Sequence, residues 1–353
     1  MGSHKGQIAW RAGGRQTVAL ALVLAAGLFL LPVLTVGGAP LYQRDGDGLP
    51  AGEAEPQAAL PIDRAAQTMA SKDRGRAVRL QKTDGTVEEL TMADYLWGVV
   101  AAEMPASFEQ EALKAQACAA RTYTAIKQKD GQTKHPGADI CGDSTCCQAY
   151  VERSQAEARW GLNAQSYSQK IEQAVAGTDG LGILYGGQPI QALFFSSAAG
   201  RTVDAVEVWG NSVDYLKSVD SPEGDEVPNY RTETALTAQQ VRELTLSAYP
   251  GADLSGDPSG WFGEIKRSQS GSVSSLILGG VTLTGGQVRT LFSLRSATFT
   301  VDWDGENFTF QVTGYGHGVG MSQYGANAMA KEGKGFEEIL TWYYTGTQVD
   351  ALW

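Results

Sequence analysis

The feature that most constrains this chain is a long apolar segment near its start. Residues 18–36 read VALALVLAAGLFLLPVLTV, and no charged residue occurs between residues 16 and 43. A helix rises about 1.5 Å per residue, so this segment is long enough to cross a hydrocarbon core about 30 Å thick. Lys5, Arg11 and Arg15 precede it without any acid, which predicts a cytoplasmic N-terminus.

We therefore predict a cytoplasmic stub over residues 1–16 and a transmembrane anchor over 17–38, which makes this a single-pass protein of the cell membrane. The alternative is a signal peptide cleaved near residues 37–39, but its apolar region would be unusually long. In both cases the rest of the chain lies outside the cytoplasm. Residues 39–76 are rich in Ala, Gly, Pro, Asp and Glu and lack periodicity, so they are predicted to be a flexible linker.

Residues 77–353 are predicted to form one α+β domain, with a division into two lobes as the alternative. Hydrophobic residues make up 42% of the chain and charged residues 19%, as in globular proteins. Strand and helix patterns mix without strict βαβ alternation, which favours short antiparallel strands. The net charge of −11 argues against nucleic-acid binding as a main function, because phosphate contacts need clustered Lys and Arg.

Local signals place the main elements of this domain. Thr91 with Asp94, and Ser107 with Gln110, have the spacing of capping boxes that open helices. The predicted elements, in order, are a hairpin over 77–90, helices ending near 104 and over 109–127, a loop over 129–147, a helix over 166–175, strands over 182–185 and 190–195, a helix over 237–249, short strands between 262 and 312, and helices over 322–331 and 336–343.

Glu103 is the first candidate for chemistry. It ends the helix that precedes Pro105, so its carboxylate meets the negative end of the helix dipole among apolar neighbours. Both effects favour the neutral carboxyl and raise its pKa toward the range of a general acid. A solvent-facing glutamate at a helix end is the commoner explanation of the same pattern.

Two cations on the next helix, Lys114 and Arg121, are seven residues apart and share a face. They can hold an anionic substrate or orient Glu103, although two solvated charges are the commoner case. Cys118 lies between small residues and is predicted to be a buried structural thiol.

A cluster of soft ligands follows in the predicted loop. His135, Cys141, Cys146 and Cys147 fall within 13 residues and include three of the four cysteines. One imidazole and three thiolates suit tetrahedral Zn²⁺ with no open position. Since the segment lies outside the cytoplasm, a disulfide between Cys141 and Cys146 or Cys147 is the alternative.

Two further motifs have less specific patterns. Residues 314–326 read GYGHGVGMSQYGA, where glycines allow close backbone approach and His317 lies near aromatic residues. This suits a wall of a sugar site, whereas a tight turn is the commoner explanation. Ser196 and Ser197 end a predicted strand, and no Ser-His-Asp order follows from them.

Taken together, these segments resemble the stage II sporulation protein D family. The likeness covers about residues 77–345 and is carried by four segments in the same order: WGVVAAEMPASFEQEALKAQACAARTY, HPGADIC with CCQAY, YLKSVDSPEGD and GHGVGMSQYGANAMA. The resemblance implies a membrane-bound lytic transglycosylase that cleaves peptidoglycan during engulfment of the forespore. It also implies an extracytoplasmic catalytic domain in the septal space between the membranes.

The resemblance carries roles to individual residues. Glu103 falls on the catalytic acid, and Lys114 and Arg121 fall on functionally important basic positions. His135, Cys141 and Cys147 fall on the ligands of a structural zinc near the active site. Cys146 stands where the zinc-binding members commonly have His, and thiolate can replace imidazole there. The remaining substrate contacts that we expect are Ser196, Ser197, His317, Gln323 and Tyr324.

The implied mechanism needs only one carboxylate. Hydrolytic glycosidases generally use two, whereas in a lytic transglycosylase the 6-hydroxyl of N-acetylmuramic acid (MurNAc) attacks its own anomeric carbon and gives a 1,6-anhydro product. The expected partners are glycan strands without stem peptides, a sporulation amidase that strips them, and a membrane scaffold of the engulfment complex. The alternatives are a non-catalytic, glycan-binding enhancer of an amidase, or a septal scaffold.

Overall fold

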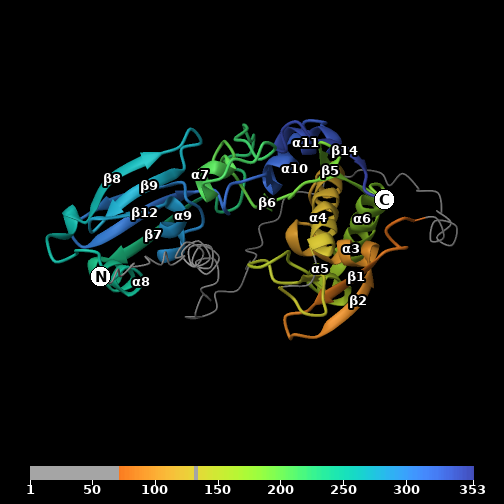
Figure 1. Cartoon of the computed structure of the whole chain (residues 1–353), viewed down its shortest axis with the longest axis horizontal. Coiled ribbons are helices and arrows are strands. Elements are labelled where there is room, and N and C mark those ends of the chain that lie inside the picture. The colour runs from red at the N-terminus through yellow and green to blue at the C-terminus, as the bar shows by residue number, and fades with distance from the viewer. Residues whose placement is uncertain (1–70, 131–133) are drawn as a thin grey trace, which may run out of the picture. The chain divides into compact units, whose positions relative to one another are not determined.

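The computed structural model describes residues 71–130 and 134–353 (Figure 1), all within one unit of the chain, Ile62–Trp353. The fold is mixed α+β with several small sheets, as predicted. The predicted stub (1–16), the anchor (17–38) and residues 39–70 of the linker lie outside the described residues. Within the described part, no helix is both long and apolar enough to cross a membrane.

The first sheet contains the predicted hairpin and one unexpected strand. β1 (Ala77–Gln81) and β2 (Val87–Thr91) pair antiparallel, and β3 (Ile140–Cys141) pairs parallel with β1. β3 lies in the region predicted to be a loop, because Asp139 attaches that region to β1. Its carboxylate accepts from the backbone N–H of Arg79 at 3.0 Å and from the Arg79 guanidinium at 2.7 Å. The pairing sets Cys141 beside Gln81.

Helices form the centre of this part of the molecule. They are α3 (Met92–Glu103), α4 (Gln110–Asp130), α5 (Arg153–Trp160) and α6 (Ala164–Ala176), with a 3₁₀ turn, η1 (Gly161–Asn163), between the last two. α4 packs against both α3 and α6 (Figure 1), and the three helices share one hydrophobic core. α5 was not expected from the sequence, because Glu152 at its N-cap makes no side-chain cap and only Ala156 is buried.

The starts of α3 and α4 are held differently. The Thr91 side chain accepts from the Asp94 N–H, as predicted. At α4 the predicted Ser107–Gln110 box is wrong: the Glu109 N–H donates to Asn327 Oδ1 at 2.8 Å, and the Gln110 amide donates to the Lys170 carbonyl. A side chain distant in sequence therefore caps the start of this helix, which local spacing cannot reveal.

The middle and the end of the chain pair with each other. The elements are β4 (Leu181–Tyr185), β5 (Gln188–Pro189), β6 (Phe194–Phe195), α7 (Ala205–Trp209), β13 (Met321–Ser322), α10 (Gln323–Lys331), α11 (Phe336–Tyr343) and β14 (Gln348–Ala351). β14, β4 and β5 form one sheet, and β6 pairs parallel with β13. The predicted strand over 190–195 is shorter than expected, because the Leu193 N–H turns back onto the Gln191 carbonyl at 2.9 Å.

A second hydrophobic cluster involves residues 236–312. It is built from β7 (Arg231–Thr237), α8 (Ala238–Ala248), the 3₁₀ turn η2 (Pro258–Gly260), β8 (Phe262–Arg267), β9 (Val273–Leu278), β10 (Val281–Leu283), α9 (Gly285–Leu291), β11 (Phe299–Trp303) and β12 (Asn307–Thr313). Two antiparallel sheets, β10-β9-β8 and β11-β12-β7, enclose an aromatic core in which Phe262, Phe292, Phe299 and Phe308 pack around or beside Phe310. The short antiparallel strands predicted here are present.

Candidate functional site

Glu103 is the last residue of α3, and its carboxylate is half-buried between segments far apart in sequence. Oε1 accepts from the backbone N–H of Ala149 at 2.7 Å, and the Gln323 amide lies 3.5 Å from Oε2. No Lys or Arg among the described residues forms an ion pair with it. Burial raises the pKa of Glu103 above its ordinary value, and the two hydrogen bonds oppose that rise. Burial therefore favours the protonated carboxyl, the form a general acid needs.

Two glutamines extend the polar environment of Glu103. Gln323, the first residue of α10, also reaches the side-chain oxygen of Gln116 on α4 at 3.4 Å. Gln116 is fully buried, and its Nε2 has no hydrogen-bond partner in the structure. An unpaired buried amide is costly, so Gln116 has a donor that can still bind a partner. The sequence analysis gave Gln116 no role; the signal was a polar residue within the helical run ALKAQACAA, which is rich in alanine.

Glu223 is a second buried carboxylate that the sequence did not single out. Its Oε1 accepts from the Ala198 N–H at 2.6 Å and from the Ser322 hydroxyl, and its Oε2 accepts from Ser221 at 2.6 Å. Ser322 is also the N-cap of α10. This network joins three segments and fixes the helix start at which Gln323 lies.

Gly325 marks how tightly that junction is packed. A Cβ atom at Gly325 would lie 2.1 Å from the Tyr343 hydroxyl and 2.5 Å from the Glu223 carboxylate. Only glycine fits at this position of the helix, which gives a physical reason for one of the glycines in the segment GMSQYGA.

Lys114 and Arg121 do not meet Glu103 through any contact in the structure. The Lys114 ammonium lies 2.6 Å from the Glu111 carboxylate, and 5.7 Å from the Phe336 ring centroid. Glu111 in turn accepts from the Phe336 N–H at 3.0 Å. Lys114 thus connects α4 to the start of α11.

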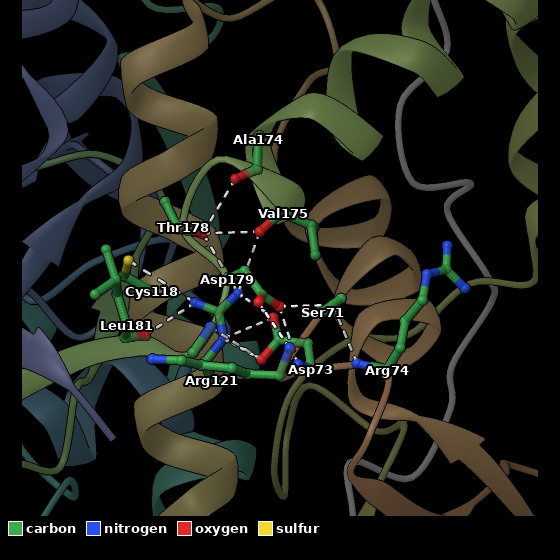
Figure 2. Close-up of polar contacts among 12 residues, drawn as sticks. Ser71, Asp73, Arg74, Cys118, Arg121, Ala174, Val175, Thr178, Asp179 and Leu181 are labelled. Atoms are coloured by element: carbon green, nitrogen blue, oxygen red, sulfur yellow. Dashed lines mark hydrogen bonds and ion pairs between the residues drawn. The ribbon is translucent and has the colours of Figure 1, made fainter. Parts of the chain in front are cut away.

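Arg121 is completely buried, and Figure 2 shows its polar contacts. Its Nη2 lies 2.6 Å from Asp73 Oδ2 and 3.3 Å from the Thr178 hydroxyl, and its Nη1 donates to the Leu181 carbonyl at 2.9 Å. Asp179 beside them accepts from the backbone N–H groups of residues 72 and 73. The predicted substrate contact of Arg121 does not fit this position, because α4 buries this face and Asp73 neutralises the cation.

His135 and three cysteines form a group able to hold a metal ion. Their ligand atoms all lie within 4.8 Å of one another, and His135 Nε2 is 3.3 Å from Cys146 Sγ and 3.4 Å from Cys147 Sγ. His135 Nδ1 lies 3.0 Å from Gln81 Oε1. An Nδ1–H that donates to this oxygen leaves Nε2 for a metal. The donor set of one nitrogen and three sulfurs therefore fits a four-coordinate metal. All four cysteines of the chain are free thiols here, so the alternative disulfide is absent.

The metal group is connected to the acid by two residues. Gln148 follows Cys147 and is buried, with its amide donating to the Tyr95 hydroxyl and to Thr124 at 3.1 Å each. Ala149, the next residue, supplies the N–H that binds Glu103. The conformation of the cysteine loop therefore sets the position of a hydrogen-bond donor to the acid.

His317 lies near aromatic rings, as the sequence suggested. Its centroid is 5.6 Å from Phe195 and 6.2 Å from Trp209, and its Nδ1 accepts from the Val319 N–H at 3.1 Å. Burial, followed by the charge of Arg289, lowers the pKa of His317 to about 4. The imidazole is therefore neutral at pH 7, with its proton on Nε2.

Ser196, Ser197 and Tyr324 take part in backbone contacts between the middle and the end of the chain. The Tyr324 N–H donates to the Ser196 carbonyl at 3.0 Å, and Ser197 pairs with Tyr315. The Tyr324 ring packs edge-on against Phe108 at 4.9 Å. Ser197 is buried, whereas Ser196 is partly exposed. The structure thus brings Gln323 to Glu103. Ser196 contacts Tyr324, the residue that follows Gln323.

Comparison with known proteins gives consistent matches. A family model described as "Stage II sporulation protein" matches residues 81–185. The chain is 36% identical to stage II sporulation protein D of Bacillus subtilis (strain 168), over 93% of each chain. It is also 36% identical to the protein of that name from Bacillus amyloliquefaciens, over 75% of each. A protein named amidase enhancer, from Bacillus subtilis (strain 168), is 29% identical over 72% of this chain and 40% of its own length.

Proposed function

Because the chain belongs to the stage II sporulation protein D family, we propose that it is a membrane-anchored lytic transglycosylase of sporulation. Its substrate would be peptidoglycan strands stripped of stem peptides, and its product a 1,6-anhydro sugar. The observation that carries the proposal is the environment of Glu103: a half-buried carboxyl with a raised pKa and no cationic partner among the described residues. Such a group suits proton donation to a glycosidic oxygen.

The proposed reaction uses Glu103 twice. The carboxyl first protonates the oxygen between MurNAc and N-acetylglucosamine (GlcNAc), so the C1–O bond breaks and GlcNAc leaves with that proton. The carboxylate then accepts the proton of the MurNAc 6-hydroxyl, while the oxygen of that hydroxyl forms a bond to C1 of the same sugar. The Ala149 N–H and the Gln323 amide stabilise the carboxylate in this second step. Glu103 ends protonated again, and no water is consumed.

The metal group has a structural part in this proposal. His135, Cys141, Cys146 and Cys147 would hold Zn²⁺, which when bound would cross-link the loop without an open position for water. The chain's own residues transmit the effect, since Gln148 and Ala149 follow Cys147 directly and Ala149 donates to Glu103. Lys114 and Arg121 would act by holding α4 in place.

The decisive test is mass spectrometry of the products from peptidoglycan strands without stem peptides. We expect the full-length protein to release fragments ending in 1,6-anhydro-MurNAc. Glu103→Gln should lower the rate about 10²–10⁴-fold. Release of reducing sugars without anhydro ends would show hydrolysis instead and would overturn the proposed chemistry.

The similarity to the amidase enhancer favours a second candidate, a non-catalytic module that binds glycan and stimulates an amidase. Under this alternative, wild type and Glu103→Ala would stimulate a sporulation amidase equally, and neither would cleave strands. We propose that in the cell the protein acts in forespore engulfment, anchored by residues 17–38 with its domain between the septal membranes. The amidase and a membrane scaffold would be its partners.

A further inference from the structure

Two arginines near the glycine-rich segment lack the carboxylate partners that most buried cations have. Arg289 is in the last turn of α9, and its Nε donates to the Arg295 carbonyl at 3.1 Å. The Arg295 guanidinium lies 3.9 Å from the Tyr315 ring centroid, and its buried Nε has no hydrogen-bond partner. Neither forms an ion pair within residues 71–130 and 134–353. Two half-buried like charges without counter-ions repel each other, which favours an anion beside them.

Backbone hydrogen bonds join Arg295 to the glycine-rich segment. The Gly316 N–H donates to the Arg295 carbonyl at 3.0 Å, and Tyr315 pairs with Ser197. One residue before Ser197, the Ser196 carbonyl accepts from Tyr324, the neighbour of Gln323. These contacts link the Arg295 carbonyl to the start of α10, where the Gln323 amide reaches Glu103.

Tyr315 and His317 shape the surroundings of the arginines. Tyr315 is 37% exposed, and the Arg295 guanidinium lies over its ring. His317 is neutral and adds no charge. A partly exposed tyrosine with a guanidinium group over its ring suits an anionic sugar, since aromatic rings pack against sugars and guanidinium binds carboxylate in a bidentate fork.

We propose that Arg289 and Arg295 form a subsite for the lactyl carboxylate of a MurNAc residue in the bound strand. The inference rests on the proposed function and deepens it. MurNAc differs from GlcNAc only by the lactyl ether at O3. Its carboxyl is an amide while a stem peptide is attached and a free carboxylate once the peptide is removed. The arginines would therefore distinguish MurNAc from GlcNAc and stripped strands from unstripped ones.

The charge of the whole protein makes such a subsite useful. A stripped strand carries one negative charge per disaccharide, and this chain has a net charge of −11. Long-range repulsion opposes their association, so affinity requires a local cationic site. Three other arginines fit poorly: Arg121 is neutralised by Asp73, and Arg201 and Arg231 pair with Asp220 and Asp225.

Binding measurements test this without depending on cleavage. Full-length Glu103→Gln protein would be titrated with stripped strands and with the same strands after conversion of their lactyl carboxylates to methylamides. We expect about tenfold weaker binding of the methylamide strands, the size of one charge-assisted contact. Adding Arg295→Gln should weaken binding of native strands by the same factor and leave binding of methylamide strands unchanged.

The control is Arg242→Gln, which removes one charge from an exposed position of α8 and should leave both affinities unchanged. Equal affinity for native and methylamide strands overturns the subsite, and this arm needs no variant to fold. A glycerol-phosphate polymer would also be added as a competitor. If it abolished the difference in affinity between native and methylamide strands, the arginines would be assigned to phosphate, and the carboxylate subsite would be overturned. If the subsite holds while wild type releases no anhydro sugar, the transglycosylase proposal fails and the subsite stands.

Discussion

At the scale of single residues, Glu103 has contacts that act in opposite directions on its proton. Burial favours the neutral carboxyl, whereas the Ala149 N–H and the Gln323 amide favour the carboxylate. A group that must give a proton and then take one back benefits from both influences. The distances are consistent with this: the backbone donor is short, at 2.7 Å, and the amide donor is long, at 3.5 Å.

Glu103→Gln should affect stability in a pH-dependent way. The folded-state pKa of Glu103 is raised above its ordinary value of about 4.5. The contribution of the protonated Glu103 to the free energy of unfolding is therefore fully present below pH 4.5, and it is lost as the pH rises through the raised pKa. Glutamine is neutral throughout. The melting temperature of the variant should equal that of wild type near pH 4 and exceed it near pH 7. A variant less stable than wild type at neutral pH would contradict the burial of the charge.

At the scale of elements, the short strand β3 and the loop around it determine the candidate site. β3 sets Cys141 beside Gln81, and Gln81 orients His135. The same segment then continues through Gln148 to the donor of Glu103. A metal held by this group would thus stabilise the loop and preserve the hydrogen bond to the acid.

Removing one ligand should show this dependence. Wild type should contain about one zinc per chain by elemental analysis, and Cys141→Ser should contain little. The variant should also cleave strands more slowly, because the loop that presents the Ala149 N–H is no longer cross-linked. Cys118→Ser is the matched control: Cys118 is buried on α4 and outside the cluster, so that variant should keep its zinc. Wild type without metal, or equal zinc loss in both variants, would contradict the site.

At the scale of the whole molecule, local signals predicted elements and long-range contacts decided their roles. The start of α3 follows from its capping residue, and the hairpin, α4, α8 and α10 follow from patterns close in sequence. The site does not, since Gln323 lies 220 residues from Glu103. Arg121 shares a helix face with Lys114, as the spacing implied, yet its partner Asp73 is 48 residues earlier. The metal group was recognisable because its four ligands are local.

The Asp73–Arg121 pair should contribute strongly to global stability. Asp73→Asn leaves the Arg121 cation buried without its counter-charge, and we expect a loss of about 3–5 kcal/mol in the free energy of unfolding. Asp225→Asn is the control. Asp225 pairs with Arg231 at 2.8 Å but on the surface, where solvent screens the pair, so its loss should leave the free energy of unfolding nearly unchanged. Urea unfolding measures both, and equal costs would show that burial does not set the energy of the pair.

The position of Asp73 also has a mechanical consequence. Asp73 lies ahead of β1, and it is attached to the middle of α4 through Arg121 and to the α6–β4 connection through Gly180. A pulling force applied to the chain before residue 71 would therefore load the buried ion pair and the helix core before it reached the β1–β2 hairpin. The fold resists such tension at α4, which carries Arg121. The hairpin and the cysteine loop beside it therefore bear less of a force applied at the N-terminal side of residue 71.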